Sequence, residues 1–266
     1  MSLKPISSRD NPLYKELKHL ATSSQARRRA QRTLLDGVHL CSAYLSQCGL
    51  PPLCIVSESA RGNPEVSALL ESCAATQCIV LPDALFNALS QVEHGVDLLF
   101  VIDTPQARPV GTLDGGAVLL DNLQDPGNVG SILRSAAAAG IKQVYCGPGT
   151  AFAWSPKVLR SGMGAHFGLD IHEHIDLAAL IRVASVPVLA TSSHADATLF
   201  DADLSQPVAW LFGHEGQGVS ADLLALATQR LAIPHLGEME SLNVAASAAI
   251  CLFEQVRQKS AQAGKR

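Results

Sequence analysis

Residues 117–140, AVLLDNLQDPGNVGSILRSAAAAG, join an apolar run to an alanine-rich segment through a polar turn. The apolar run 117–123 predicts a buried β-strand, and the segment that follows the turn predicts a helix. Two glycines in the turn allow the backbone to approach a ligand closely, and Asn128 or Ser131 is placed to cap the helix. The stretch therefore predicts a strand–turn–helix unit of an α/β sheet. By itself, its turn is either a ligand site at the carboxyl end of the strand or a capped helix start with Arg134 on the surface.

The same alternation of strand-like and helix-like segments extends on both sides of this unit and ends in a long helix predicted to start near Ser241. The stretch DTPQARPVGTLDGG (103–116) interrupts the alternation with two prolines and three glycines, which is typical of a linker. We therefore expect a smaller α/β domain over 1–105 and a linker over 106–115. The second domain, over 116–266, is expected to have a Rossmann-like, mostly parallel sheet with helices on both faces.

The bulk composition narrows the class of protein. Of the 266 residues, 47% are hydrophobic and 17% are charged, so the chain can bury a sizeable core. It contains no apolar run long enough for a membrane helix and no apolar leader, and its seven cysteines form no CxxC pair. His172 and His174 share one face of a possible strand, but a metal site needs more ligands close by. We expect a cytoplasmic protein with reduced thiols, no membrane contact and no metal.

The charge distribution is asymmetric. Residues 1–32 contain eight basic and two acidic side chains, a local charge of +6, whereas the whole chain carries −4. A basic segment before an acidic body suits contact with a phosphate backbone, although a solvated helix face has the same pattern. The candidate RNA-binding residues are Arg27, Arg28, Arg29 and Arg32.

Two further loops combine glycines with polar side chains at predicted strand ends. LFGHEGQGVS (211–220) has three glycines around Glu215, more than a tight turn needs, so a ligand or another backbone is expected to pass closely. IPHLGEMESLNVAASAAI (233–250) places Asn243 in the first turn of the last predicted helix, where an asparagine answers a local hydrogen-bonding need. None of the three loops has the GxGxxG spacing of a dinucleotide site, which disfavours a nicotinamide-dependent oxidoreductase.

Taken in order, NVGSILRS (128–135), GHEGQG (213–218) and ESLNVA (240–245) resemble the three motifs of the SpoU (TrmH-like) branch of the SPOUT RNA methyltransferases. The resemblance covers roughly 116–258. The opening of the first domain is similar to the substrate-binding domain that precedes the catalytic domain in many of these enzymes.

The resemblance implies a fold with a deep trefoil knot in its C-terminal part and a homodimer formed through the catalytic domain. It implies transfer of a methyl group from S-adenosylmethionine to a ribose 2′-hydroxyl of RNA. The first domain favours ribosomal RNA (23S) over transfer RNA by analogy. The alternatives are a transfer RNA methyltransferase and a catalytically silent RNA-binding or ribosome-assembly protein with the same fold.

The resemblance also assigns site residues. The polar residues expected at the reaction centre are Asn128, Arg134, Glu215, Ser241 and Asn243. The residues expected to hold the cofactor are Thr191, Gly213, Ile233 and Leu242. His235 departs from the family pattern, because many relatives have methionine there. Family members use the arginine to activate the hydroxyl. Because arginine stays protonated in proteins, we expect Arg134 to hold a phosphate or the developing alkoxide, with proton removal by Arg134 as the open alternative.

Overall fold

The computed structural model describes residues 3–92, 95–105, 110–193 and 195–263. It forms two compact units. The first comprises Met1–Gln106 together with Trp154–Phe167, and the second comprises Ala107–Ala153 and Gly168–Arg266. Part of the predicted linker 106–115, namely 106–109, lies outside the described residues. Among the described helices, none is both long and apolar enough to cross a membrane.

The first unit is built on a five-stranded sheet with the order β1-β4-β3-β5-β2. Its strands are β1 (Leu3–Pro5), β2 (Arg32–Asp36), β3 (Leu53–Ser57), β4 (Gln77–Leu81) and β5 (Leu98–Asp103). Strand β5 runs antiparallel to both of its neighbours, and β1, β4 and β3 run parallel to one another. The sequence pattern does not predict β1, because this three-residue strand is defined only by its pairing with β4.

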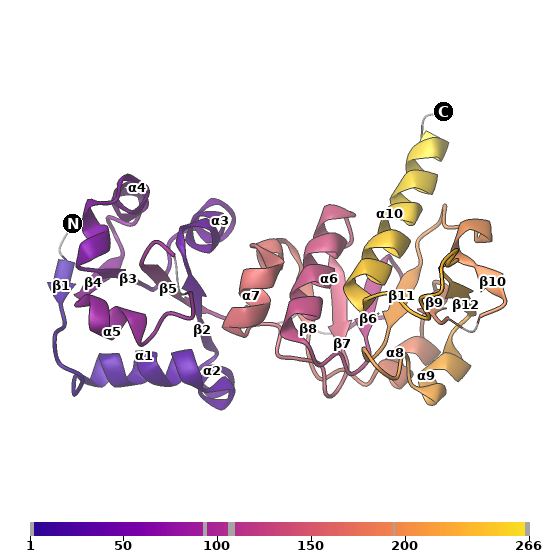
Figure 1. The fold of residues 1–266 in the computed structure, drawn as a ribbon, viewed down its shortest axis with the longest axis horizontal. Coiled ribbons are helices and arrows are strands. Elements are labelled where there is room, and N and C mark those ends of the chain that lie inside the picture. The colour runs from indigo at the N-terminus through magenta and orange to yellow at the C-terminus, as the bar shows by residue number, and fades with distance from the viewer. Residues whose placement is uncertain (1–2, 93–94, 106–109, 194, 264–266) are drawn as a thin grey trace. The chain divides into compact units, whose positions relative to one another are not determined.

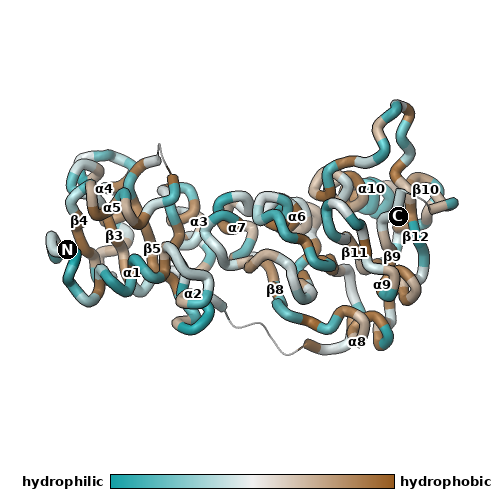
Figure 2. Tube along the Cα trace, turned by 60° about the horizontal axis from the view of Figure 1, so that its bottom comes forward, coloured by the Kyte–Doolittle hydropathy of each residue, from teal (hydrophilic) through white to brown (hydrophobic). Residues whose placement is uncertain are grey.

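Helices cover both faces of this sheet (Figure 1). They are α1 (Pro12–Thr22), α2 (Ser24–Ala30), α3 (Val38–Cys48), α4 (Pro64–Ser72) and α5 (Asp83–Asn87), with a 3-10 turn η1 (Ser59–Gly62). Helices α1 and α5 bury their apolar side chains against one face, where Leu17 and Phe86 are almost fully buried. Figure 2 shows hydrophobic residues along β3 and β5, as burial on both faces requires.

The first unit also contains the segment Trp154–Phe167, which includes α7 (Pro156–Gly162). The hydroxyl of Thr33 in β2 donates a buried hydrogen bond of 2.7 Å to the carbonyl of Trp154. The rings of Tyr44 and Phe167 meet edge to face at 5.3 Å. The sequence pattern placed this segment in the second domain, because a strand-like run precedes it and another follows it. These tertiary contacts attach the segment to the first unit.

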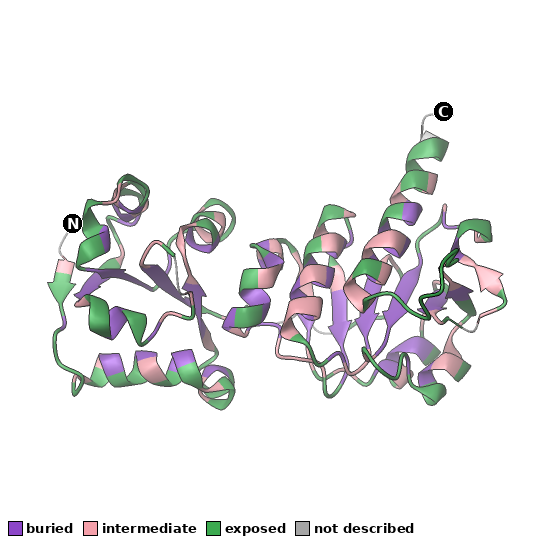
Figure 3. Ribbon diagram, in the orientation of Figure 1, coloured by how far each residue is buried: buried purple, intermediate pink, exposed green. Residues whose placement is uncertain are grey.

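The second unit contains a seven-stranded sheet in which all neighbouring strands are parallel, with the order β10-β12-β9-β11-β6-β7-β8. The strands are β6 (Ala117–Leu120), β7 (Gln143–Cys146), β8 (Asp170–His172), β9 (Val188–Thr191), β10 (Ala197–Thr198), β11 (Ala209–Phe212) and β12 (Gln229–Ala232). Figure 3 shows that the central strands are buried, and β6 and β11 are buried along their whole length. The predicted α/β fold with a mostly parallel sheet is therefore confirmed.

Helices α6 (Pro126–Ala138) and α10 (Val244–Ala263) pack together on one face of this sheet, and α8 (Leu177–Arg182) and α9 (Ala221–Leu226) cover the other (Figure 1). The 3-10 turns η2 (Ala165–Gly168) and η3 (Leu199–Asp201) complete the elements. The carboxylate of Asp125 caps α6 by accepting from the amide of Asn128 at 2.9 Å. The predicted caps Asn128 and Ser131 are wrong, because Pro126 already occupies the first helical position.

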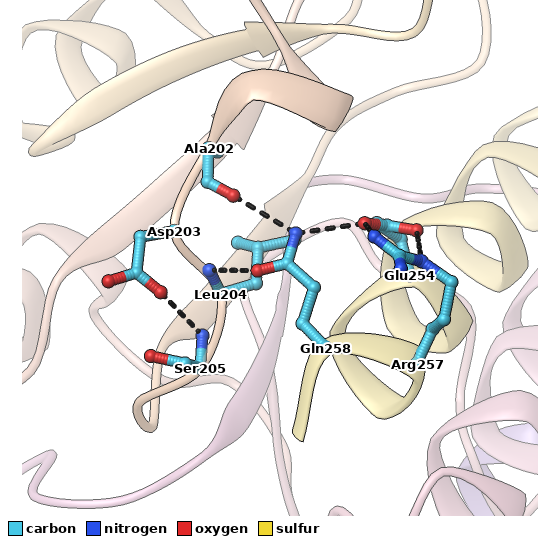
Figure 4. A network of polar contacts seen from close by, with 7 residues as sticks. All are labelled: Ala202, Asp203, Leu204, Ser205, Glu254, Arg257 and Gln258. Carbon is cyan, nitrogen blue, oxygen red and sulfur yellow. Dashed lines mark hydrogen bonds and ion pairs between the residues drawn. The ribbon is translucent and has the colours of Figure 1, made fainter. Parts of the chain in front are cut away.

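A polar network holds α10 against the loop that precedes β11 (Figure 4). The side chain of Gln258 accepts from the amide of Leu204 at 2.8 Å and donates to the carbonyl of Ala202 at 3.0 Å. One turn earlier, Gln255 accepts from the indole of the buried Trp210 at 3.0 Å. Because buried polar groups are costly without partners, these pairings fix the position of α10 along the sheet.

The packing of α7 leads to a stability prediction. Replacing the fully buried Leu159 by alanine should cost about 2–5 kcal/mol through lost burial and a cavity. In hydrogen exchange measured by mass spectrometry, amides of β2 and α3 should exchange faster, and those of β6, β9 and β11 should not change. The exposed Lys157→Ala in the same helix is the matched control. Acceleration centred on β6 and β11 would contradict the grouping of α7 with the first unit.

Candidate active site

The carboxyl ends of β9, β11 and β12 surround a cavity of about 360 Å³ in the second unit. Its walls come from three separate chain segments. The four residues that the resemblance assigns to the cofactor all line it: Thr191, Gly213, Ile233 and Leu242. Glu215 and Ser241 line it as well. In parallel sheets, ligands bind at this edge, where the strand ends and their loops leave a crevice.

The loop after β11 folds back on itself next to the cavity. The amide of Gly218 donates to the carbonyl of His214 at 2.8 Å, and Nδ1 of His214 accepts from the amides of Gly216 and Gln217. A Cβ atom on Gly213 would lie 2.1 Å from the backbone of Gly218, so only glycine fits there. The close approach inferred from the glycines is thus made, at Gly213, by the backbone of the same loop.

The lining of the cavity fits S-adenosylmethionine. Its apolar residues, among them Val219, Ile233 and Leu242, offer a surface for a flat base, and serines, threonine and backbone groups supply polar contacts. The described residues that line the cavity include no lysine or arginine, so none repels the positive sulfonium of this molecule. A volume of about 360 Å³ also lies in the range of about 300–1,000 Å³ that is usual for such pockets.

A chain of hydrogen bonds links the three motifs beside this cavity. The side-chain amide of Asn128, on α6, donates to the carboxylate of Glu215 at 3.1 Å. The side-chain oxygen of Asn128 accepts from the side-chain amide of Asn243 at 3.0 Å. The oxygen of Asn243 in turn accepts from the amides of Ala245 and Ala246, at 2.9 and 3.3 Å. Each asparagine therefore uses both ends of its amide.

Asn243 also acts as the cap of the last helix. Helix α10 begins at Val244, and not near Ser241 as the sequence pattern predicts. The side chain of Asn243 satisfies two amides of the first turn that have no partner within the helix.

The carboxylate of Glu215 is held in place and charged. Desolvation acts to raise its pKa, but hydrogen bonds from Asn128 and from the backbone outweigh this, so the pKa of Glu215 is lowered. The amides of Gln124 and Asp125 donate to its two oxygens at 3.2 and 3.0 Å. A carboxylate with a lowered pKa is a weak base at neutral pH. Glu215 therefore serves to position the turn before α6 and the side chain of Asn128.

The other two residues expected at the reaction centre stand apart from this chain of hydrogen bonds. Arg134 is exposed on α6, and its side chain makes no hydrogen bond or ion pair with any residue that the structure describes. Ser241 is exposed at the wall of the cavity. Both side chains are thus accessible to a bound substrate.

Sequence reasoning missed two aspartates that shape the site. Asp121, directly after β6, accepts from the amide of Ser220 at 2.8 Å and ties the first loop to the second. Asp125 caps α6, and its amide binds Glu215. The run DNLQD (121–125) carries a signal for this role, because aspartate and asparagine at a strand end favour side-chain to backbone hydrogen bonds.

The candidate RNA-binding arginines of the first unit differ in their surroundings. Arg27 is buried and donates to the carbonyls of Leu20 and Ala21, and burial lowers the pKa of this guanidinium. Its side chain therefore serves the fold of the α1–α2 corner. Arg28 and Arg29 are exposed, and Arg32 pairs with carboxylates. Within the described part of the chain, no group of three or more His, Cys, Asp or Glu is placed to hold a metal ion.

Comparison with known proteins gives this geometry a context. The chain is 34% identical, over 96% of its length and 94% of the relative, to an uncharacterized tRNA/rRNA methyltransferase of Synechocystis. It is 31% identical to the 23S rRNA (guanosine(2553)-2′-O)-methyltransferase RlmP of Bacillus subtilis, with 94% of this chain and 98% of that protein covered.

A solved structure is similar over nearly the whole chain. The SpoU methyltransferase AviRb of Streptomyces viridochromogenes, in complex with AdoMet, superposes with a TM-score of 0.83 at 27% identity, covering 94% of this chain and 98% of that one. The model of the SpoU rRNA Methylase family matches residues 116–253, which include all three motif loops and the cavity they surround. The chain therefore belongs to the SpoU rRNA methylase family.

Proposed function

We propose that this protein is an S-adenosylmethionine-dependent methyltransferase that modifies the 2′-hydroxyl of a ribose in 23S ribosomal RNA. The observation that carries the proposal is the hydrogen-bonded chain Glu215–Asn128–Asn243 beside a cavity suited to the methyl donor. The names of the relatives support ribosomal RNA as the substrate class, and the relative solved with AdoMet supports the cofactor.

The cavity residues would hold the cofactor. Backbone groups at Ile233 and Leu242 would bind its adenine. The backbone of Gly213 would also contact the cofactor, and Thr191 would form a further wall of its site. When bound, S-adenosylmethionine supplies a methyl group on a positively charged sulfur, so no metal is needed to activate it.

The polar residues would then position the ribose. Asn128 is held from both sides, so its orientation is fixed before the substrate arrives, and fixed orientation is what in-line transfer requires. Arg134 lies on the same helix, and because an arginine side chain is a cation in proteins, it would hold a phosphate or the developing alkoxide oxygen. The hydroxyl proton would leave to a neighbouring phosphate or to water, and Ser241 would contact the substrate from the cavity wall.

The finer features of the family are also part of the proposal. We infer a trefoil knot in the region of β11, β12 and α10, and a homodimer formed through the second unit. Exposed apolar side chains support such an interface: Leu236, Met239 and Phe253. The first unit would bind RNA through the exposed Arg28 and Arg29, together with Arg32. We also propose a cytoplasmic location.

Calorimetry with S-adenosylmethionine tests the proposed activity, together with a map of ribose methylation in total RNA from cells with and without the gene. We expect saturable binding of the cofactor and loss of one methylated ribose in 23S RNA. Absence of binding at millimolar S-adenosylmethionine would contradict the proposed enzymatic activity and favour a catalytically silent RNA-binding protein. If only transfer RNA loses a methyl group, the substrate is transfer RNA and not 23S ribosomal RNA.

The polar chain makes a prediction about Asn128. Asn128→Ala removes the link between Glu215 and Asn243, and misplacing the reacting groups by about 1 Å costs on the order of a hundredfold in rate. We expect kcat to fall by about this factor, with unchanged affinity for S-adenosylmethionine, because Asn128 does not line the cavity. Ser131→Ala, one turn along the same helix, is the control and should keep full activity. An equal loss in both variants would argue against the positioning role.

The pH profile of Arg134→Lys separates the two roles of the arginine. Lysine has the lower pKa, about 10.4, and lacks the planar fork of donors that arginine offers to a phosphate. If Arg134 holds charge, the variant should be slow at every pH up to about 10. Recovery of kcat toward that pH would instead identify the side chain as the base.

A further inference from the structure

The first unit contains a second cavity, of about 490 Å³, which the proposed methyl transfer itself does not use. It lies where α1, the end of α2, the start of β2 and the end of β5 meet. The residues that line it are Glu16, Ala30, Gln31, Arg32, Asp103 and Thr104. Its volume falls in the range of about 300–1,000 Å³ that small ligands occupy.

The charges in this cavity are arranged around one guanidinium. Nε of Arg32 donates to Oδ1 of Asp103 at 2.9 Å, which fixes the plane of the guanidinium. The contact from Arg32 to Oε1 of Glu16 is 3.7 Å, too long for a hydrogen bond. The side chain of Glu16 is half exposed, and its carboxylate therefore has acceptor capacity left for a ligand.

The residue Gln31 also lines this cavity, and its backbone conformation is unusual. Gln31 ends α2 in the left-handed region, with φ of 50°, where glycine is the usual residue. The backbone amide of Gln31 donates to the carbonyl of Arg28. Its backbone carbonyl accepts from the amide of Thr104, and this bond links two residues that line the cavity. A glutamine at this position bears a conformational cost and brings an amide side chain to the cavity.

The lining excludes a phosphate and favours a nucleobase. Two carboxylates against one guanidinium repel a phosphate group. A planar base can stack on the guanidinium of Arg32, and its edge can form hydrogen bonds with the carboxylate of Glu16 and the side-chain amide of Gln31. Proteins recognise unpaired RNA bases by such stacking and edge contacts. The exposed Arg28 and Arg29 lie one turn earlier on α2, where the phosphates that flank such a base would find cations.

We propose that this cavity binds an unpaired guanine base of the RNA, with Glu16 accepting its N1–H and N2–H and Arg32 stacking on its face. Guanine has two adjacent donors on its Watson–Crick edge, which one carboxylate accepts together. Adenine, cytosine and uracil each place an acceptor beside a donor there, so the same carboxylate meets a repulsive oxygen or nitrogen. The proposal rests on RNA as the substrate class and adds a base-specific contact outside the catalytic cavity.

Fluorescence anisotropy with labelled single-stranded RNA tests this contact in the full-length protein. The probes are heptamers of uridine alone and of uridine with one central guanosine or adenosine, at one salt concentration. We expect the wild-type protein to prefer the guanosine heptamer by about tenfold, the scale of a bidentate base contact. Glu16→Gln, which keeps the shape of the side chain, should remove this preference, and its affinity for oligouridine should rise, because one carboxylate that repels the phosphates is gone.

Glu71→Gln is the matched control, because it removes an exposed carboxylate from α4 in the same unit and should keep the preference. The proposal is overturned if the wild-type protein binds all heptamers equally, or if Glu16→Gln still prefers guanosine. In either case RNA binding itself stands. If no heptamer binds, RNA recognition by this unit falls together with the guanine site, whereas binding of S-adenosylmethionine still tests the proposed catalytic function by itself.

Discussion

The side-chain amide of Asn128 is the interaction on which the site depends, because it binds one motif through its nitrogen and another through its oxygen. Burial of Glu215 opposes its ionisation, but the hydrogen bonds that it accepts from Asn128 and from the backbone outweigh this and lower its pKa, which favours the charged carboxylate. Asn243 must donate to Asn128, and its own oxygen is occupied by two amides at the start of α10. Glu215 therefore orients the side chain of Asn128, and Asn128 and the start of α10 together orient the side chain of Asn243.

This chain explains why the loops contain the residues they do. A helix start needs an acceptor for its free amides, and both α6 and α10 obtain one from a side chain, Asp125 and Asn243 respectively. The loop after β11 needs a glycine at Gly213, because its backbone turns back within 2.1 Å of where a Cβ would lie. Capping and close packing thus produce the rigid edge of the cavity, and a rigid edge is what precise methyl transfer requires.

The sequence predicted the alternation of elements well, because buried strands and amphipathic helices have distinct hydrophobic periods. The strands that enclose the cavity were all expected, from runs such as PVLATSS and VAWLFG. Strand β1 was not, since three residues without a periodic pattern become a strand only by pairing with β4. Arg27 was expected at an RNA surface, because a run of arginines does not show which one turns inward, and this one donates to Leu20 and Ala21.

The sequence by itself determined the class of fold and the identity of the polar residues, because strand and helix periods and glycine-rich strand ends are local properties of the chain. Only the tertiary structure decided which of those residues meet. Asn128 and Asn243 are 115 positions apart, and their contact depends on the strand order that brings α10 beside α6. The same holds for Trp154, whose carbonyl binds Thr33 across 121 positions. Contacts over such separations depend on packing, and no local pattern encodes them.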